Sequence, residues 1–174
     1  MPTDDGAADH LLGAELPALA FEATAGAPVV LPELAAGTLV LYLYPRTGVP
    51  GEDPPAGWDE IPGAQGCTPQ SCSFRDHHAE LDALGARVVG LSSQTSDYQR
   101  EAAERLNLPF PLLADPELRL AAALDLPTFT VAGMRLYKRL TLVARAGTVV
   151  KVFYPVFPPD RNAEEVLAWL QEEA

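Results

Sequence analysis

Lysine, cysteine and long apolar runs are scarce in this sequence of 174 residues. It has two lysines and two cysteines, and no apolar stretch approaches the roughly 18 residues of a membrane-spanning helix. Acidic residues outnumber lysine and arginine by 24 to 12, which gives a formal net charge of −12. Such a surface repels phosphates, so we expect no nucleic acid and no membrane among its partners.

The opening residues, MPTDDGAADH, lack the basic start and the apolar stretch of a secretory signal peptide. We therefore expect a cytoplasmic protein. The cytosol keeps ordinary thiols reduced, so a structural disulfide would be unusual there. Two closely spaced cysteines, Cys67 and Cys72, instead indicate redox or metal-binding chemistry.

The length and the hydrophobic content of 48% predict a single domain, residues 1–174, with a real core behind a loose lead-in at 1–16. The expected strands are 29–34 (a short strand and turn), 38–45, 87–93, 109–115 and a hairpin over 140–156 that turns near Ala146-Gly147. The expected helices are 68–84, 96–106, 116–124 and 162–173. Alternating strands and helices followed by a hairpin predict an α/β fold, a three-layer α/β/α domain with a mixed central sheet.

A long loop, residues 46–66, separates the strand expected at 38–45 from the helix expected at 68–84. It contains five glycines and four prolines and has no apolar periodicity. Loops of this length inside a compact domain are usually functional or mobile. We expect Trp58 to pin this loop to the body of the domain.

Cys67 stands at the start of the helix expected at 68–84, where Thr68 is a good N-cap and Pro69 suits the first helical position. A helix N-terminus carries about half a positive charge and unpaired N–H groups. Both favour a thiolate over a thiol, and the thiolate is the nucleophilic form of cysteine. The position of Cys67 is thus suited to a reactive cysteine.

Cys72 follows five residues later in the same helix. On a regular helix this spacing puts the two Cα atoms roughly 8–9 Å apart and turns the side chains by about 140°. A disulfide needs the Cα atoms within about 7 Å, so Cys67 and Cys72 can bond only if the first helical turns unwind. The spacing therefore suits a transient disulfide better than a permanent one.

Two other interpretations of the cysteines remain open at this point. Both could be inert thiols, one of them buried as a small hydrophobic residue. Alternatively, Cys67, Cys72, His77 and His78 could form a zinc site. Adjacent histidines on a helix point about 100° apart, so both rarely bind one ion. We therefore favour a solvated helix face for the two histidines.

The segment GCTPQSCSFRD, residues 66–76, resembles the active-site segment of the peroxiredoxins called bacterioferritin comigratory proteins, or PrxQ. The resemblance extends over most of the chain. LPALAFEATAGAPVVLPELAAGTLVLYLYP is similar to the family's opening, and RVVGLSSQTSDYQREAAERLNLPFPLLAD is similar to its middle. KRLTLVARAGTV resembles the segment that carries the family's active-site arginine. The order and the spacing of these segments are specific to the family.

This resemblance implies a thioredoxin-like fold and a thiol-dependent peroxidase. Cys67 matches the peroxidatic cysteine, Cys72 the helical resolving cysteine, and Arg139 the active-site arginine. A guanidinium at that place would hold the thiolate charged and polarise the peroxide oxygens. Without the resemblance, Arg139 would be interpreted as part of a surface ion pair. Arg75 and Asp76 match the family's Arg-Asp, which we interpret as a local ion pair that orders the helix.

The sequence departs from the family immediately before Cys67. Peroxiredoxins carry a proline seven residues and a Thr or Ser three residues before the reactive cysteine, where this chain has Glu60 and Ala64. Pro45-Arg-Thr47 resembles the start of that motif, with the 46–66 loop as an insertion, and we expect Thr47 to reach the site with its hydroxyl. Counted from Pro45, however, the family's hydroxyl position falls on Val49.

The family implies a complete catalytic cycle. Cys67 would reduce hydrogen peroxide and organic hydroperoxides and become a sulfenic acid, and Cys72 would close a disulfide onto it. A dithiol reductant such as thioredoxin would reopen that disulfide. No metal, haem or flavin is needed, and we expect a monomer or a weak homodimer.

Two alternative functions share the same residues. The chain could be a redox-sensing interaction protein, in which the disulfide switches a binding surface formed by the 46–66 loop. A sensor would react once and slowly without a recycling partner, so turnover distinguishes it from a peroxidase. A disulfide oxidoreductase is disfavoured because its usual redox pair has the Cys-x-x-Cys spacing.

Overall fold

The computed structural model describes residues 2–48, 51–61 and 64–173. Two short parts of the 46–66 loop, 49–50 and 62–63, therefore lie outside the described residues, and with them Val49.

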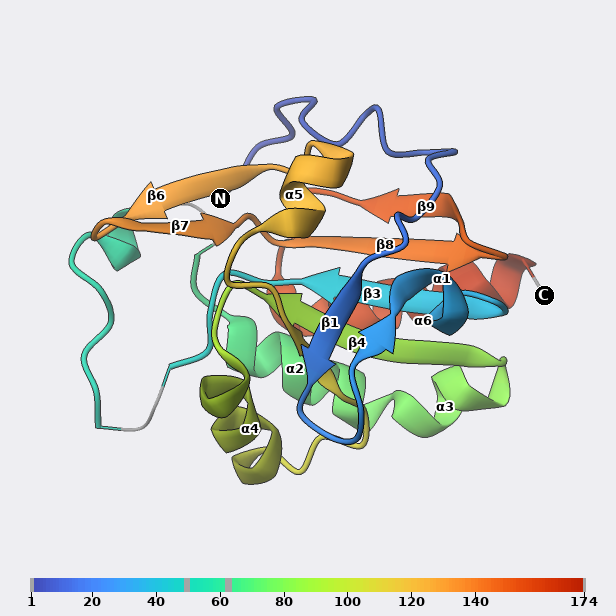
Figure 1. Ribbon diagram of the computed structural model, residues 1–174, viewed down its shortest axis with the longest axis horizontal. Helices are drawn as coiled ribbons and strands as arrows, with labels where there is room; N and C mark the ends of the chain where they lie inside the picture. The colour runs from blue at the N-terminus through green and yellow to red at the C-terminus, as the bar shows by residue number, and fades with distance from the viewer. Residues whose placement is uncertain (1, 49–50, 62–63, 174) are drawn as a thin grey trace.

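Seven strands form a mixed sheet at the centre of the domain, in the order β2-β1-β5-β4-β3-β8-β9 (Figure 1). The three middle strands β5, β4 and β3 run parallel, and the flanking pairs are antiparallel. The strands are β1 Ala20–Ala23, β2 Val29–Val30, β3 Thr38–Leu43, β4 Ala86–Ser92, β5 Leu112–Ala114, β8 Leu140–Arg145 and β9 Thr148–Phe153. A separate hairpin pairs β6 Thr128–Val131 with β7 Met134–Tyr137.

The helices lie on both faces of the sheet, which confirms the predicted three-layer α/β/α arrangement with a mixed sheet. They are α1 Leu31–Leu34, α2 Cys67–Asp76, α3 His78–Ala83, α4 Ser96–Arg105, α5 Arg119–Leu124 and α6 Asn162–Glu173, with the short 3-10 helices η1 Trp58–Glu60 and η2 Pro159–Arg161. The core clusters place α1 and α5 on one face of the sheet and α2, α3 and α6 on the other. In Figure 1, α5 lies in the upper part of the view and α2, α3 and α4 lie in the lower part.

Alternation along β3 divides the core into two layers. Leu39, Leu41 and Leu43 face a cluster that includes residues of α1 and α5. Val40 and Tyr42 face the cluster under α2, α3 and α6. All five side chains are buried, as expected for a central strand covered on both faces.

Most predicted elements are present, with shifted ends. The helix expected at 68–84 is divided at His77, whose φ of −100° separates α2 from α3. The segment 29–34 forms β2 and then α1. The hairpin over 140–156 is confirmed, and its turn residues Ala146 and Gly147 have φ values of 50° and 80°. Such positive values are those that a tight two-residue hairpin turn requires.

The opening segment is not the loose lead-in that the sequence suggested. Leu11 is fully buried in the core and Glu15 forms a bridge with Thr148 of β9. Asp5 accepts hydrogen bonds from the Tyr154 hydroxyl at 2.9 Å and from Lys138 at 3.2 Å. The backbone N–H of residue 7, followed by these two donors, lowers the pKa of Asp5 to about 2. Apolar burial and these contacts hold the segment on the domain.

Gly90, on the central strand β4, allows Tyr42 and Leu112, which belong to the same core cluster, to pack close against the strand. A Cβ at this position would lie 2.7 Å from both Leu112 Cδ2 and Tyr42 Cζ. Gly90→Ala should lower the free energy of unfolding by about 1–3 kcal/mol, because the packed ring cannot retreat. Denaturant unfolding measures this, and Gly37→Ala is the control, since a Cβ at Gly37 meets nothing within 4 Å. Equal stabilities of the two variants would contradict this packing.

Candidate active site

Cys67 is the first residue of α2 and is 4% exposed. The preceding residue, Gly66, has a φ of 105°, a value that side-chain-bearing residues rarely adopt. A Cβ on Gly66 would also lie 2.6 Å from Pro159 Cγ in η2. Position 66 therefore requires glycine for two reasons: the backbone turns into the helix with a positive φ, and η2 packs against the position closely.

Arg139 lies between β7 and β8 and is buried, with 4% exposure, so it is not part of a surface ion pair. Its Nη2 atom is 3.2 Å from Cys67 Sγ. The same nitrogen donates to the carbonyl oxygens of Ala64 at 3.2 Å and Gln65 at 3.1 Å. The guanidinium thus joins the end of the 46–66 loop to the sulfur and places a positive charge where a thiolate would need one.

A chain of buried polar side chains orients this guanidinium. Arg139 Nη1 donates to Gln70 Oε1 at 2.6 Å, and Gln70 Nε2 donates to Asn162 Oδ1 at 3.1 Å. The Thr141 hydroxyl donates to the same Asn162 oxygen at 2.7 Å. Gln70, Thr141 and Asn162 are fully buried. The chain links α2, β8 and α6, and sequence reasoning did not identify any of these three residues.

Tyr42 supports α2 from the sheet. Its ring stacks on Phe74 with centroids 4.7 Å apart, and its hydroxyl is 3.0 Å from the Ser71 hydroxyl. Burial, followed by the nearby Tyr44, raises the pKa of Tyr42 well above its usual range. The phenol therefore stays neutral and serves as a hydrogen-bonding group between the sheet and the helix.

Cys72 lies in the middle of α2 and is partly exposed. Both cysteines are free thiols in this structure. The helix is continuous from Cys67 to Asp76. The premise of the predicted unwinding, a regular helix that separates Cys67 from Cys72, is therefore met.

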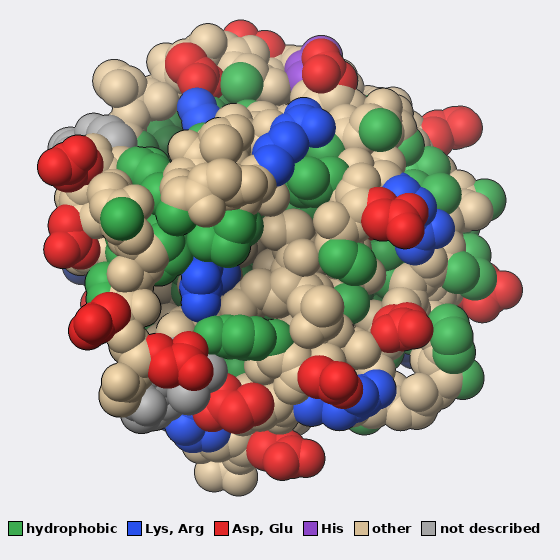
Figure 2. Space-filling view, turned by 60° about the vertical axis from the view of Figure 1, so that its left-hand side comes forward, with side chains coloured by type: hydrophobic (Ala, Val, Ile, Leu, Met, Phe, Trp, Pro, Cys, Tyr) green, Lys and Arg blue, Asp and Glu red, His purple; other side chains and the backbone are tan. Residues whose placement is uncertain are grey.

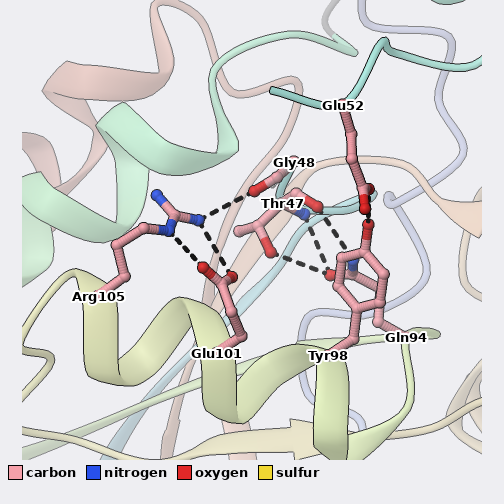
Figure 3. A network of polar contacts seen from close by, with 7 residues as sticks. All are labelled: Thr47, Gly48, Glu52, Gln94, Tyr98, Glu101 and Arg105. Atoms are coloured by element: carbon pink, nitrogen blue, oxygen red, sulfur yellow. Dashed lines mark hydrogen bonds and ion pairs between the residues drawn. The ribbon is translucent and has the colours of Figure 1, made fainter. Parts of the chain in front are cut away.

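Thr47 is buried at the start of the 46–66 loop, where Gln94 binds both its side chain and its backbone (Figure 3). The Thr47 N–H and hydroxyl donate to Gln94 Oε1 at 3.0 and 3.3 Å, and Gln94 Nε2 donates to the Thr47 carbonyl at 3.1 Å. Among the described contacts, the partner of this hydroxyl is Gln94. The suggestion that Thr47 serves the reaction stays a prediction.

Helix α4 holds the same end of the loop through three of its side chains, as Figure 3 shows. Arg105 donates to the Gly48 carbonyl at 2.9 Å and is itself held by Glu101 at 2.6 Å. The Tyr98 hydroxyl donates to Glu52 Oε2 at 3.0 Å. Gly48 and Glu52 are thereby tied to α4.

Trp58, in η1, anchors the middle of the loop as predicted. It is 8% exposed and packs in a cluster with Ala64, Val131 and Leu136, the last two from the β6–β7 hairpin. Its ring centroid lies 6.3 Å from that of Phe129 on β6. The β6–β7 hairpin, which the sequence analysis did not predict, therefore supports the middle of this long loop.

A cleft of about 270 Å³ lies between the loop and the start of α2, and Cys67 is part of its wall. Its described lining residues come from these two segments alone: Arg46, Gly48, Glu52, Asp53, Pro54, Pro55, Trp58, Ala64, Gln65, Gly66, Cys67, Thr68 and Pro69. The arrangement offers a nucleophilic sulfur at a helix N-terminus, a buried cation beside it and a small cavity from which a substrate can approach.

The remaining polar residues of this helix have structural contacts. Arg75 and Asp76 form the predicted ion pair at 3.0 Å, and Arg75 also donates to the Leu106 carbonyl at 2.8 Å. His77 Nδ1 is 3.0 Å from Glu80 Oε1. Within the described part of the chain, no group of three or more His, Cys, Asp or Glu residues could hold a metal ion. No helix among the described residues is long and apolar enough to cross a membrane.

The chain is similar to known proteins over most of its length. The family model described as Redoxin matches residues 11–167. The chain is 30% identical over 162 residues to a chloroplastic peroxiredoxin Q of Sedum lineare, covering 91% of this chain and 77% of that protein.

Two solved structures are similar over nearly the whole chain. The peroxidoxin BcpB of Mycobacterium tuberculosis superposes with a TM-score of 0.76 at 26% identity, covering 94% of this chain and 97% of that one. A bacterioferritin comigratory protein of Xanthomonas campestris, studied for its alkyl peroxide reduction activity, gives 0.74 at 25% identity, covering 95% and 99%. These likenesses confirm the thioredoxin-like fold.

Replacing the buried guanidinium should slow the oxidation of Cys67. We expect Arg139→Ala to lower the second-order rate constant for oxidation of Cys67 by hydrogen peroxide by about a hundredfold. This is the usual effect of removing one hydrogen-bond donor to a developing charge. Stopped-flow measurement of a single oxidation event tests this. Arg135→Ala is the matched control, since Arg135 is exposed on β7 and bonds to Thr128. A rate unchanged in Arg139→Ala would exclude it from the reaction.

Proposed function

The chain belongs to the Redoxin family as a peroxiredoxin of the PrxQ and Bcp type, and we propose that Cys67 is the thiol with which it reduces peroxides. It is thus a thiol peroxidase of the atypical two-cysteine type. The observation that carries the assignment to Cys67 is its contact with the buried Arg139, 3.2 Å away, at the N-terminus of α2. Both the helix and the guanidinium stabilise a thiolate.

The reaction begins with attack of the Cys67 thiolate on one peroxide oxygen. The O–O bond breaks, the leaving oxygen takes a proton to become water or an alcohol, and the sulfur becomes a sulfenic acid. Arg139 binds the oxygens on which negative charge develops. Gln70 keeps the guanidinium in this orientation through the 2.6 Å hydrogen bond. The cavity of about 270 Å³ suits hydrogen peroxide and short organic hydroperoxides.

The second half of the cycle regenerates the thiol. Cys72 attacks the sulfenic sulfur, a disulfide forms and the hydroxyl leaves as water. A dithiol reductant such as thioredoxin then attacks the disulfide, becomes oxidised itself and releases both cysteines as thiols. Such a cycle needs a reducing compartment, for which we propose the cytoplasm. The Sedum relative is named as chloroplastic. We propose a monomer or a weak homodimer.

Peroxide consumption with thioredoxin, thioredoxin reductase and NADPH tests the whole proposal. We expect wild type to turn over many times and Cys67→Ser to be inactive. Cys72→Ser should reduce one equivalent of peroxide, after which mass spectrometry should show a sulfenic or higher acid on Cys67. Turnover by Cys67→Ser, or an unmodified Cys67 in the other variant, would contradict these roles. A wild type that reacts only once would favour a redox sensor.

Formation of the Cys67–Cys72 disulfide should unwind the first turns of α2. The cysteines are about 8–9 Å apart at Cα on a regular helix, beyond the reach of a disulfide. Unwinding must break the hydrogen bonds of Gln70 and free Gly66 from Pro159, so the adjoining loop should loosen too.

Hydrogen exchange on the reduced and the oxidised protein measures this unwinding. Amides of residues 68–76 should exchange at least tenfold faster after oxidation, whereas those of α4 serve as an internal control. Equal protection of 68–76 in both states would mean that the helix does not unwind.

A further inference from the structure

The inserted loop brings an unusual density of negative charge to the approach to Cys67. Glu52, Asp53, Asp59 and Glu60 are all exposed, and no Lys, Arg or His occurs between residues 47 and 66. Figure 2, which brings forward the side of the molecule that carries the loop, shows acidic side chains gathered at the lower left of this face. The loop therefore carries a local excess of negative charge within a protein whose overall net charge is −12.

Two of these carboxylates line the cleft that contains Cys67. Glu52 and Asp53 belong to its wall, and Asp59 is held beside it by a hydrogen bond from the lining residue Gln65. Glu52 has a defined position because its Oε2 atom accepts a hydrogen bond from the Tyr98 hydroxyl at 3.0 Å. Hydrogen bonds thus hold Glu52 and Asp59 on the loop side of the cleft.

The positive charges nearby do not cancel this excess. Arg46 is the one cation in the described lining of the cleft, and its Nη2 donates to the Tyr98 hydroxyl at 3.0 Å while its guanidinium lies 5.6 Å from the Tyr98 ring centroid. Arg139 is buried beside Cys67, and its charge is balanced by the thiolate during the reaction. One cation against Glu52 and Asp53 leaves the entrance negative.

We propose that the carboxylates of Glu52 and Asp53 act as an electrostatic filter that admits uncharged peroxides to Cys67 and disfavours anionic ones. This inference rests on the proposed function and names its substrate class: hydrogen peroxide and neutral short-chain hydroperoxides, rather than hydroperoxides that carry a carboxylate. Fixed charges at a cleft mouth change the local concentration of a charged substrate and hence its rate of encounter. Neutral peroxides do not experience this field.

The preference for neutral over anionic peroxides should depend on the ionic strength. Interactions between exposed charges are screened beyond about 10 Å at 0.1 M ionic strength and beyond about 3 Å at 1 M. Discrimination against an anionic peroxide should therefore be largest at low ionic strength and should largely vanish in molar salt, with no change in the reaction of a neutral peroxide.

The test uses a short tertiary alkyl hydroperoxide that carries a carboxylate, together with its methyl ester, so that the pair differs mainly in charge. Single-turnover oxidation of Cys67 is followed by stopped-flow. In wild type at low salt we expect the ester to react about three to ten times faster than the carboxylate. In Glu52→Gln/Asp53→Asn this ratio should fall to about one, because both charges are removed while Gln can still accept from Tyr98.

A matched control removes the same number of charges elsewhere. Glu172 and Glu173 are exposed at the end of α6, at the opposite side of the molecule from the loop in Figure 1. Glu172→Gln/Glu173→Gln should keep the wild-type ratio. Equal ratios in wild type and in Glu52→Gln/Asp53→Asn, or an equal fall in the control, would overturn the filter and leave the peroxidase assignment standing. Failure of both peroxides to oxidise Cys67 would overturn the filter and the peroxidase assignment together.

Discussion

The contact between Cys67 and Arg139 is the interaction around which the rest of the site is arranged. A thiolate that is almost wholly buried is costly unless a cation and hydrogen-bond donors compensate it. Arg139 is equally buried, so the cation also needs partners, and it obtains them from Gln70 and from the carbonyls that precede α2. Each charge thus makes the burial of the other tolerable, and the neighbouring segments are fixed as a result.

The contacts that hold the start of α2 in place also oppose a step of the catalytic cycle. Gln70, Asn162 and the approach of Pro159 to Gly66 hold the first turn of α2 in place, which keeps the sulfur beside its guanidinium. The proposed disulfide requires that very turn to unwind. The hydrogen bonds that prepare Cys67 for peroxide are therefore also those that must break before Cys72 can reach it, and their strength sets the balance between the two steps.

The sequence was informative where a signal is local or carried by a motif. Helix 162–173 and the hairpin turn at Ala146-Gly147 follow from periodicity and turn chemistry, and the resemblance pointed to Arg139, although only the structure shows it to be buried. The sequence analysis did not predict the hairpin of β6 and β7, although its Ala-Gly turn and its alternating apolar and polar residues are signals of such a hairpin. Gln70 and Asn162 could not be paired from sequence, because their contact joins positions far apart in the chain.

Anchoring by Trp58 helps the fold to carry the long loop between β3 and α2. The connection from Pro45 to Cys67 is about three times as long as the family's usual spacing, and a threefold lengthening costs only about 1 kcal/mol of loop-closure entropy. Burial of one large aromatic side chain against the hairpin returns about 2 kcal/mol or more. Burial of this one side chain thus offsets the closure entropy that the extra length of the loop costs.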